Sequence, residues 1–221
     1  MKNIKEGKKK RYLAIIFDLD GTLIDSLPYH VKAFREILRE NEIKISNKKL
    51  KLLIGVPSEI IFKKFKKKYH LMKKVEDLRE ERRKYYFKLA GKRNIVFPGV
   101  KKILKKLRKK HKLAIATGSS KVVFHYSFKK DFQELFNVVV TISDVKNGKP
   151  NPEQLLLAAK KMKIRPEKCL MIGDSIYDGI AASRAKMDFI AVTTGFTSKK
   201  VLKKYGAKKV ISSLPKLRNL V

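Results

Sequence analysis

Four aspartates in two short segments are the residues of this chain best placed to do chemistry. Asp18 and Asp20 lie in FDLDGTLIDS, and Asp174 and Asp178 lie in IGDSIYDG. Each segment follows an apolar run of the kind that forms a buried parallel strand, so the carboxylates stand at strand ends. A single aspartate there is usually a turn former or a helix cap. Two such clusters instead favour a site for Mg²⁺, which takes carboxylate oxygens as ligands.

Hydroxyl groups and a lysine follow two further apolar runs. Thr117, Gly118 and Ser119 close the run KLAIAT, and Lys149 stands in NGKPNPE, after the run NVVVT. Open parallel α/β sheets bind ligands beyond the carboxyl ends of their strands, so we expect these groups beside the aspartates. Hydroxyl and backbone N–H groups bind phosphate oxygens, and an ammonium adds a point charge. Together with the carboxylates they predict a site for a metal ion and a phosphate group.

The elements that must position these groups alternate along most of the chain. Short apolar runs predict strands, and amphipathic patterns between them predict helices, an alternation typical of an α/β fold. The predicted strands cover residues 13–17, 112–117, 137–141, 169–172 and 189–193. We therefore expect a Rossmann-like parallel sheet with helices on both faces.

Residues 24–93 break this alternation. They show helical patterns with no strand between them, including an apolar stripe at Val31, Phe34, Ile37 and Leu38. We expect a small all-helical cap domain here, inserted after the first strand. The catalytic core then consists of residues 1–23 and 94–221.

The motifs that carry these residues resemble those of a known family. DLDGT at Asp18–Thr22, IATGS around Thr117, GKPNP around Lys149 and GDSIYD from Gly173 occur in the order found in haloacid-dehalogenase-superfamily hydrolases. The helical block after the first motif resembles the cap-bearing subgroup, which includes phosphoglycolate phosphatases and β-phosphoglucomutases. The resemblance implies a phosphatase, since the dehalogenase and phosphonate-cleaving branches depart from the pattern at Asp20.

The resemblance also implies roles for the two aspartates of the first motif. Asp18 is the expected nucleophile, which attacks phosphorus and becomes an aspartyl phosphate. Asp20 is the expected general acid for the leaving oxygen and then the base that activates water. Because like charges raise the pKa of one member of a carboxylate cluster, we expect Asp20 to begin the reaction protonated.

Further site residues follow from the same resemblance. The residues expected to bind the phosphoryl oxygens are Thr117, Gly118, Ser119 and Lys149, of which Lys149 also counts as catalytic. The expected Mg²⁺ ligands are Asp18, Asp20 through its backbone carbonyl, and Asp174. Two residues are expected to support the site, namely Ser175 and Asp178, the latter through the waters of the metal or by orienting Lys149.

The hinge and the cap loop bear on the choice of reaction. His30 in DSLPYH stands where β-phosphoglucomutases carry a histidine, although a structural hydrogen bond near a helix N-terminus also explains it. Gly55–Ser58 aligns with the loop that reads the substrate, where β-phosphoglucomutases carry an arginine for a second phosphate. Here Ser58 and Glu59 stand instead. We therefore predict a Mg²⁺-dependent phosphatase acting on a small phosphomonoester, with a phosphosugar mutase as the alternative. Other cap residues that could supply the missing charge are Lys63, Lys64 and Lys88.

The net charge of the chain predicts that it attracts anions but does not identify which anion it binds. Lysine and arginine number 55 against 20 acidic residues in 221, a formal net charge of +35. Such a surface can bind nucleic acid nonspecifically through phosphate contacts. A basic nucleic-acid-binding protein that uses the fold as a scaffold is therefore the alternative from another class. No helix-turn-helix, RNA-recognition or zinc-finger pattern supports it, and lysine-rich surfaces also occur in thermophile proteins.

The remaining features concern location and assembly. The single cysteine, Cys169, excludes an intrachain disulfide and fits a reducing compartment. No apolar run reaches the roughly 18 residues that a membrane span needs. We expect a cytoplasmic protein that binds a small phosphorylated metabolite and no membrane. Because a large like charge opposes self-association, we also expect a monomer.

Overall fold

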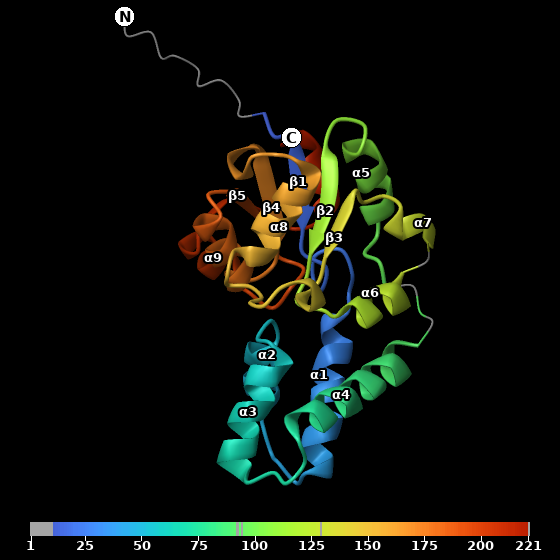
Figure 1. Ribbon diagram of the computed structural model, residues 1–221, viewed down its shortest axis with the longest axis vertical. Helices are drawn as coiled ribbons and strands as arrows, with labels where there is room; N and C mark the ends of the chain where they lie inside the picture. Colours follow the sequence, from blue (N-terminus) through green and yellow to red (C-terminus); the bar gives the residue numbers. More distant parts are fainter. Residues whose placement is uncertain (1–10, 92, 94, 129, 221) are drawn as a thin grey trace, which may run out of the picture.

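The computed structural model of the chain describes residues 11–91, 93, 95–128 and 130–220 (Figure 1). Its centre is a six-stranded parallel sheet with the strand order β3-β2-β1-β4-β5-β6. The strands are β1 (Ala14–Phe17), β2 (Lys112–Ala116), β3 (Val138–Val140), β4 (Cys169–Gly173), β5 (Asp188–Val192) and β6 (Ala207–Ile211). The predicted Rossmann-like α/β fold is confirmed.

Helices fill the connections between the strands. Five of them lie between β1 and β2, and the first four of these are α1 (Leu27–Glu40), α2 (Asn47–Leu53), α3 (Ser58–Tyr69) and α4 (Val75–Ala90). The others are α5 (Val100–Leu107), α6 (Lys121–Ser127), α7 (Lys130–Gln133), α8 (Glu153–Met162), α9 (Ile176–Arg184) and α10 (Lys199–Lys204). Short 3₁₀ turns are η1 (Ile142–Asp144), η2 (Pro166–Lys168) and η3 (Leu214–Asn219). Within the described ranges, no helix combines the length and the apolarity needed to cross a bilayer.

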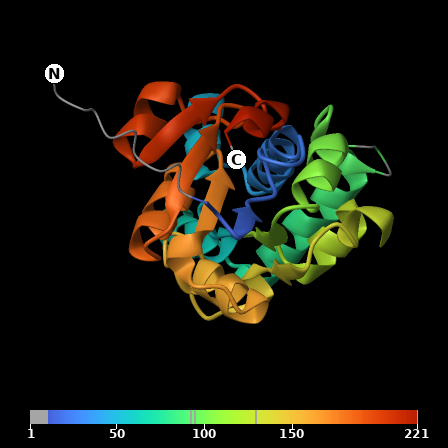
Figure 2. The same ribbon diagram turned by 90° about the horizontal axis from the view of Figure 1, so that it is seen from above.

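Strand β1 is buried on both faces, and its side chains alternate between two apolar clusters. Ile15 and Phe17 pack with residues of α5, α6, α7 and η3. Ala14 and Ile16 pack with residues of α8, α9 and α10. Helices accordingly lie on both sides of the strands when the molecule is seen from above (Figure 2). A strand buried in this way offers no polar position, so the polar residues begin only after Phe17.

The first four helices after β1, namely α1 to α4, have an apolar core of their own. It includes Phe34 of α1, Leu50 of α2, Phe62 of α3 and Leu78 of α4. The helices lie together below the sheet in Figure 1. A smaller cluster in which Tyr86 and Ala90 of α4 meet Val123 of α6 joins them to the rest of the molecule.

The position of β1 in the sheet decides where the polar segments meet. β1 pairs with both β2 and β4, and Phe17 lies opposite Ile115 on one side and Ile172 on the other. The segments that follow these three strands therefore start side by side. The strand order also reverses about β1, which is where open α/β sheets bind ligands.

Helix α9, which carries Asp178, packs closely against the segment after α10, and Gly179 permits this approach. A Cβ atom at Gly179 would lie 2.3 Å from the backbone oxygen of Tyr205 and 3.1 Å from the Phe189 ring. A backbone atom at that distance cannot move aside as the end of a flexible side chain can. The close packing thus depends on the absence of a side chain at this position.

Gly179→Ala is expected to lower the free energy of unfolding by about 1–3 kcal/mol, the usual effect of overpacking. This loss should appear although alanine favours a helix interior over glycine by about 1 kcal/mol. Urea unfolding followed by circular dichroism measures it. Ser183→Ala, at an exposed position of the same helix, is the matched control and should not destabilise. A Gly179→Ala protein as stable as the wild type would show that α9 can move away from Tyr205 without cost.

Candidate active site

The loop after β1 turns sharply beside the end of β4. Asp18 follows the strand directly, and its backbone N–H donates to the carbonyl of Ile172 in β4 (2.8 Å). Gly21 then adopts a φ of +80°, and a Cβ atom there would lie 2.7 Å from Oδ2 of Asp174. Glycine is the residue that tolerates both this backbone conformation and this approach. The turn therefore brings the segment with Asp18 and Asp20 against Asp174.

The segment after β4 supplies the second pair of aspartates. The Asp174 carboxylate accepts a hydrogen bond from the hydroxyl of Thr22 (3.0 Å). Thr22 lies in the motif DLDGT but was not among the predicted site residues. Ser175 and Asp178 form a capping box at the start of α9. In it the Asp178 carboxylate accepts from the N–H (3.0 Å) and the hydroxyl (2.6 Å) of Ser175. One Asp178 oxygen is thus fixed by the helix cap, and the other is left to face the site.

Lys149 joins the two segments. Its Nζ donates to Oδ1 of Asp18 (2.7 Å) and to Oδ1 of Asp178 (2.6 Å), and all three side chains are buried. Burial by itself lowers the pKa of an ammonium, but the two carboxylates outweigh it and raise the pKa of Lys149 above its usual range. Lys149 is therefore a permanent cation in the site.

Three carboxylates gather closely enough to hold a metal ion. Oxygen atoms of Asp18, Asp174 and Asp178 lie within 4.8 Å of one another. Burial raises the pKa of Asp18 to about 7 despite the attraction of Lys149. Burial and the neighbouring carboxylates raise the pKa of Asp174 well above its usual range. Both shifts mean that the buried site disfavours further negative charge even with Lys149 present. An all-oxygen donor set of this kind suits a hard divalent cation.

Asp20 stands apart from these three carboxylates. Its Oδ1 accepts from the hydroxyl of Ser26 (2.5 Å) and contacts Nε2 of His30 (3.1 Å), and its Oδ2 accepts from the hydroxyl of Ser119 (2.7 Å). Burial acts to raise the pKa of Asp20, but His30 and the two hydroxyl donors hold it well below its usual range. The prediction that Asp20 begins protonated therefore does not hold for the site without substrate, where Asp20 is a carboxylate. The raised pKa values fall instead on Asp18 and Asp174, for which burial is the largest cause.

His30 links Asp20 to helix α4. Its ring stacks on Tyr86 with a centroid separation of 4.4 Å and an interplanar angle of 13°. Its Nδ1 lies 3.4 Å from NH1 of Arg82. Because the Asp20 carboxylate can only accept at Nε2, we assign the ring proton to Nε2, which leaves Nδ1 to accept from Arg82. The hydrogen bond of His30 is thus made to a site carboxylate and not to the helix terminus.

The loop after β2 faces Asp20. The hydroxyl of Thr117 accepts from the N–H of Ser119 (3.0 Å) and lies 3.5 Å from Oδ2 of Asp20. Sequence reasoning missed the buried Gln154, which ties this loop to the lysine loop. Its amide donates to the carbonyl of Thr117 (2.6 Å), and its side-chain oxygen accepts from the N–H of Lys149 (3.4 Å). The available signal was a glutamine on the otherwise apolar face of α8.

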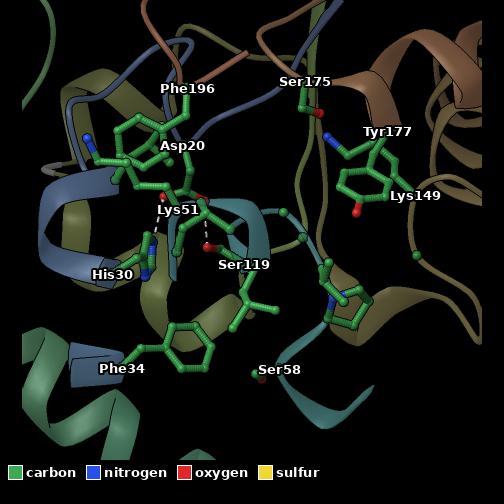
Figure 3. Close-up of a pocket in the computed structure, with 18 of the residues that line it drawn as sticks. Asp20, His30, Phe34, Lys51, Ser58, Ser119, Lys149, Ser175, Tyr177 and Phe196 are labelled. Atoms are coloured by element: carbon green, nitrogen blue, oxygen red, sulfur yellow. Dashed lines mark hydrogen bonds and ion pairs between the residues drawn. The ribbon is translucent and has the colours of Figure 1, made fainter. Parts of the chain in front are cut away.

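The site opens into a cavity of about 850 Å³ that it shares with helices α1 to α4 (Figure 3). The predicted site residues that line it are Asp18, Asp20, Gly118, Ser119, Lys149, Asp174 and Ser175. Thr117 and Asp178 are fully buried behind them. The lysines and arginines that α2 and α4 contribute to its lining are Lys48, Lys51, Arg79, Arg82 and Arg83. The lysines predicted to supply the charge of the missing arginine do not line the cavity, namely Lys63, Lys64 and Lys88.

Comparisons with known proteins agree with this geometry. The family described as haloacid dehalogenase-like hydrolase matches residues 15–192. A phosphorylated carbohydrates phosphatase from Thermotoga maritima is 30% identical over 178 residues, which cover 78% of this chain and 80% of the relative. Among solved structures, a hydrolase from Pseudomonas syringae is similar with a TM-score of 0.82 and 30% identity, covering 94% of this chain and 96% of that one. A β-phosphoglucomutase from Clostridium difficile has a TM-score of 0.79 and 26% identity, covering 93% of each chain. With a match that runs from the first strand through the fifth, the chain belongs to the haloacid dehalogenase-like hydrolases and is an enzyme of that family.

Proposed function

We propose that the chain is a Mg²⁺-dependent phosphatase that hydrolyses a small phosphomonoester through an aspartyl-phosphate intermediate. The observation that carries the proposal is the difference between two neighbouring carboxylates. Asp18 is paired with Lys149 at the floor of the cavity, whereas Asp20 is held separately by hydroxyl groups and His30. One carboxylate is thus placed to act as nucleophile and the other to transfer protons, as a two-step phosphoryl transfer requires. The phosphatase from Thermotoga maritima supports the reaction class.

In the first step, a carboxylate oxygen of Asp18 attacks phosphorus. The bond from phosphorus to the leaving oxygen breaks, and that oxygen keeps the electron pair and takes a proton from Asp20. Lys149 and the donors of the loop Thr117–Ser119 hold the phosphoryl oxygens, so that fixed groups stabilise the developing charge. A phosphate dianion raises the pKa of a neighbouring carboxylate, so Asp20 takes up its proton as the substrate binds.

In the second step, water attacks the phosphorus of the aspartyl phosphate. Asp20, again a carboxylate, accepts a proton from this water, and the bond between phosphorus and Asp18 breaks to release inorganic phosphate. The hydrogen bonds from Ser26 and His30 keep Asp20 in the orientation that both steps need. Asp18 ends the cycle as a free carboxylate.

The residues that would hold Mg²⁺ are Asp18, Asp174 and the backbone carbonyl of Asp20. Asp178 already accepts hydrogen bonds from Lys149 and Ser175, so we assign it a supporting role. Glycine leaves the site open beside Asp174, because a Cβ atom at Gly195 would lie 1.7 Å from its Oδ2. When bound, the ion offsets the charge of the carboxylates and draws charge from the phosphoryl oxygens.

The helical insertion has a role in the same proposal. We propose that residues 24–93 act as a cap over the core formed by residues 1–23 and 94–221. Its separate apolar core and its share of the cavity lining support this division.

A phosphosugar mutase is the second candidate, supported by the similarity to a β-phosphoglucomutase structure. The loop Gly55–Ser58 lines the cavity but contains no arginine, which favours hydrolysis. Glucose 1-phosphate separates the two reactions. A phosphatase releases glucose and inorganic phosphate, whereas a mutase yields glucose 6-phosphate.

Asp18→Asn is expected to lower the kcat for p-nitrophenyl phosphate by about a thousandfold or more, because the amide is not a nucleophile. Wild-type activity should require Mg²⁺, disappear with EDTA and return when Mg²⁺ is restored. The release of p-nitrophenolate measures both effects. Asp77→Asn, at an exposed position of α4 outside the cavity lining, is the control and should retain activity. An Asp18→Asn protein that turns over at the wild-type rate would contradict the proposal.

Asp20→Asn is expected to keep Mg²⁺ binding and to lose turnover, by about 10²- to 10⁴-fold for an alkyl phosphate, the usual size of general acid–base catalysis. The loss should be smaller for p-nitrophenyl phosphate, because its leaving group departs without a proton. Titration calorimetry measures the affinity for Mg²⁺, and phosphate release measures turnover. Near wild-type turnover of the alkyl phosphate would remove Asp20 from the mechanism.

The net charge of +35 is expected to speed the capture of an anionic substrate, so that kcat/KM falls as salt is added. The measurement is kcat/KM from low to about 0.3 M salt, repeated with a second salt to exclude a specific ion effect. Retention of DNA in a gel over the same range tests the nucleic-acid alternative. DNA binding that is lost by about 0.2 M salt while activity stays intact would mark it as screening-sensitive background. A flat kcat/KM profile would mean that the surface charge is unrelated to the chemistry.

A further inference from the structure

One cation on the cap side of the cavity has a buried donor without a partner. Arg82 projects from α4 and lines the cavity. Its Nε is the single buried side-chain nitrogen or oxygen without a hydrogen-bond partner in the part of the chain that the structure describes. Leaving a buried charged donor unpaired is costly, so native proteins rarely do so without a reason. A ligand that accepts a hydrogen bond from Nε of Arg82 supplies such a reason.

The contacts of Arg82 orient its guanidinium without neutralising it. The Phe34 ring lies 4.8 Å from Cζ and supports one face of the plane. NH1 is directed at Nδ1 of His30 (3.4 Å), a ring nitrogen that carries no negative charge. This arrangement leaves the edge formed by Nε and NH2 for another acceptor. That edge offers two parallel N–H groups, the fork that matches a carboxylate or a phosphate.

The acidic residues nearby do not supply this acceptor. Glu80, which lines the same cavity, is paired with Arg83. Glu59 lies 3.7 Å from Arg79. Among the described side chains, no carboxylate oxygen comes within ion-pair distance of Arg82. Burial lowers the pKa of Arg82 to about 10 despite the attraction of Asp20, so it remains a cation at neutral pH.

The location of Arg82 relative to Asp20 indicates which part of a substrate would reach it. Asp20 must contact the leaving oxygen, so the leaving group lies on the Asp20 side of the reacting phosphorus. A single imidazole ring, that of His30, separates Asp20 from Arg82. Arg82 therefore faces the leaving group and not the transferred phosphoryl group, which Lys149 and the loop after β2 hold.

We propose that Arg82 binds an oxyanion on the leaving group of the substrate, so that the enzyme selects phosphomonoesters that carry a second anionic group. The proposal rests on the phosphatase function proposed above. It places the recognition of that group on helix α4, in a chain whose loop Gly55–Ser58 has no arginine. A carboxylate and a second phosphate share the chemistry that fits the guanidinium fork.

Two matched pairs of substrates test the proposal and distinguish the two oxyanions. Phosphoglycolate against 2-hydroxyethyl phosphate tests a carboxylate, and glucose 1,6-bisphosphate against glucose 1-phosphate tests a second phosphate. In the wild type, kcat/KM should favour the anionic member of at least one pair by about tenfold or more. Arg82→Met should reduce that preference by about 10- to 100-fold, the range for losing a hydrogen bond to a charged group. Arg82→Lys keeps the positive charge but loses the two parallel N–H groups. Its preference for the anionic substrate should therefore lie between those of the wild type and Arg82→Met.

The decisive measurement is the ratio of kcat/KM between the two substrates of a pair. Both substrates depend equally on Asp20, so a disturbance of His30 changes both kcat/KM values and leaves their ratio unchanged. Lys84→Met is the matched control, since Lys84 is exposed on the same helix and does not line the cavity. It should leave the ratio at the wild-type value. The proposal is overturned if the wild type shows no preference in either pair, or if Arg82→Met lowers kcat/KM equally for both members. If none of these esters is hydrolysed, p-nitrophenyl phosphate included, the phosphatase function fails first and this proposal fails with it.

Discussion

The ion pairs of Lys149 with Asp18 and Asp178 are the interaction on which the rest of the site depends. Parallel pairing of β1 with β4 brings the carboxylates that follow both strands into one buried region. Buried like charges are costly, and a cation placed between two of them offsets part of that cost. The distances of 2.7 and 2.6 Å from Nζ show how directly Lys149 does this. The raised pKa values of Asp18 and Asp174 show that a further positive charge is still favoured there.

The same loop gives its two aspartates opposite electrostatic surroundings. Asp18 is buried beside other carboxylates, and burial raises its pKa despite the attraction of Lys149. Asp20, two positions along the chain, is surrounded by hydroxyl donors and His30, so its pKa is lowered. Environment and not residue type therefore separates the two carboxylates. Since His30 contacts both Asp20 and Arg82, it connects the loop after β1 to helix α4, which lines the cavity.

The orientation of helices α3 and α4 about their own axes decides which of their lysines and arginines line the cavity. On α3, Ile61, Phe62 and Phe65 pack into the apolar core of the cap. The lysines between them, Lys63 and Lys64, are thereby turned to the solvent. The guanidinium that approaches the site comes instead from α4. A strongly basic chain thus presents only a few of its cations to the cavity, and the orientation of apolar stripes selects them.

The parallel sheet and the residues at its strand ends could be predicted because they depend on local pattern. Short apolar runs identify the strands, and a polar residue directly after a buried strand has only the sheet edge to occupy. The charge state of Asp20, the connecting role of Gln154 and the choice of Arg82 could not be predicted in this way. The sequence by itself determined which groups stand at the edge of the sheet. Only the tertiary structure decided how charge is shared among them and which cap cation faces them, because both depend on distances between segments far apart in the chain.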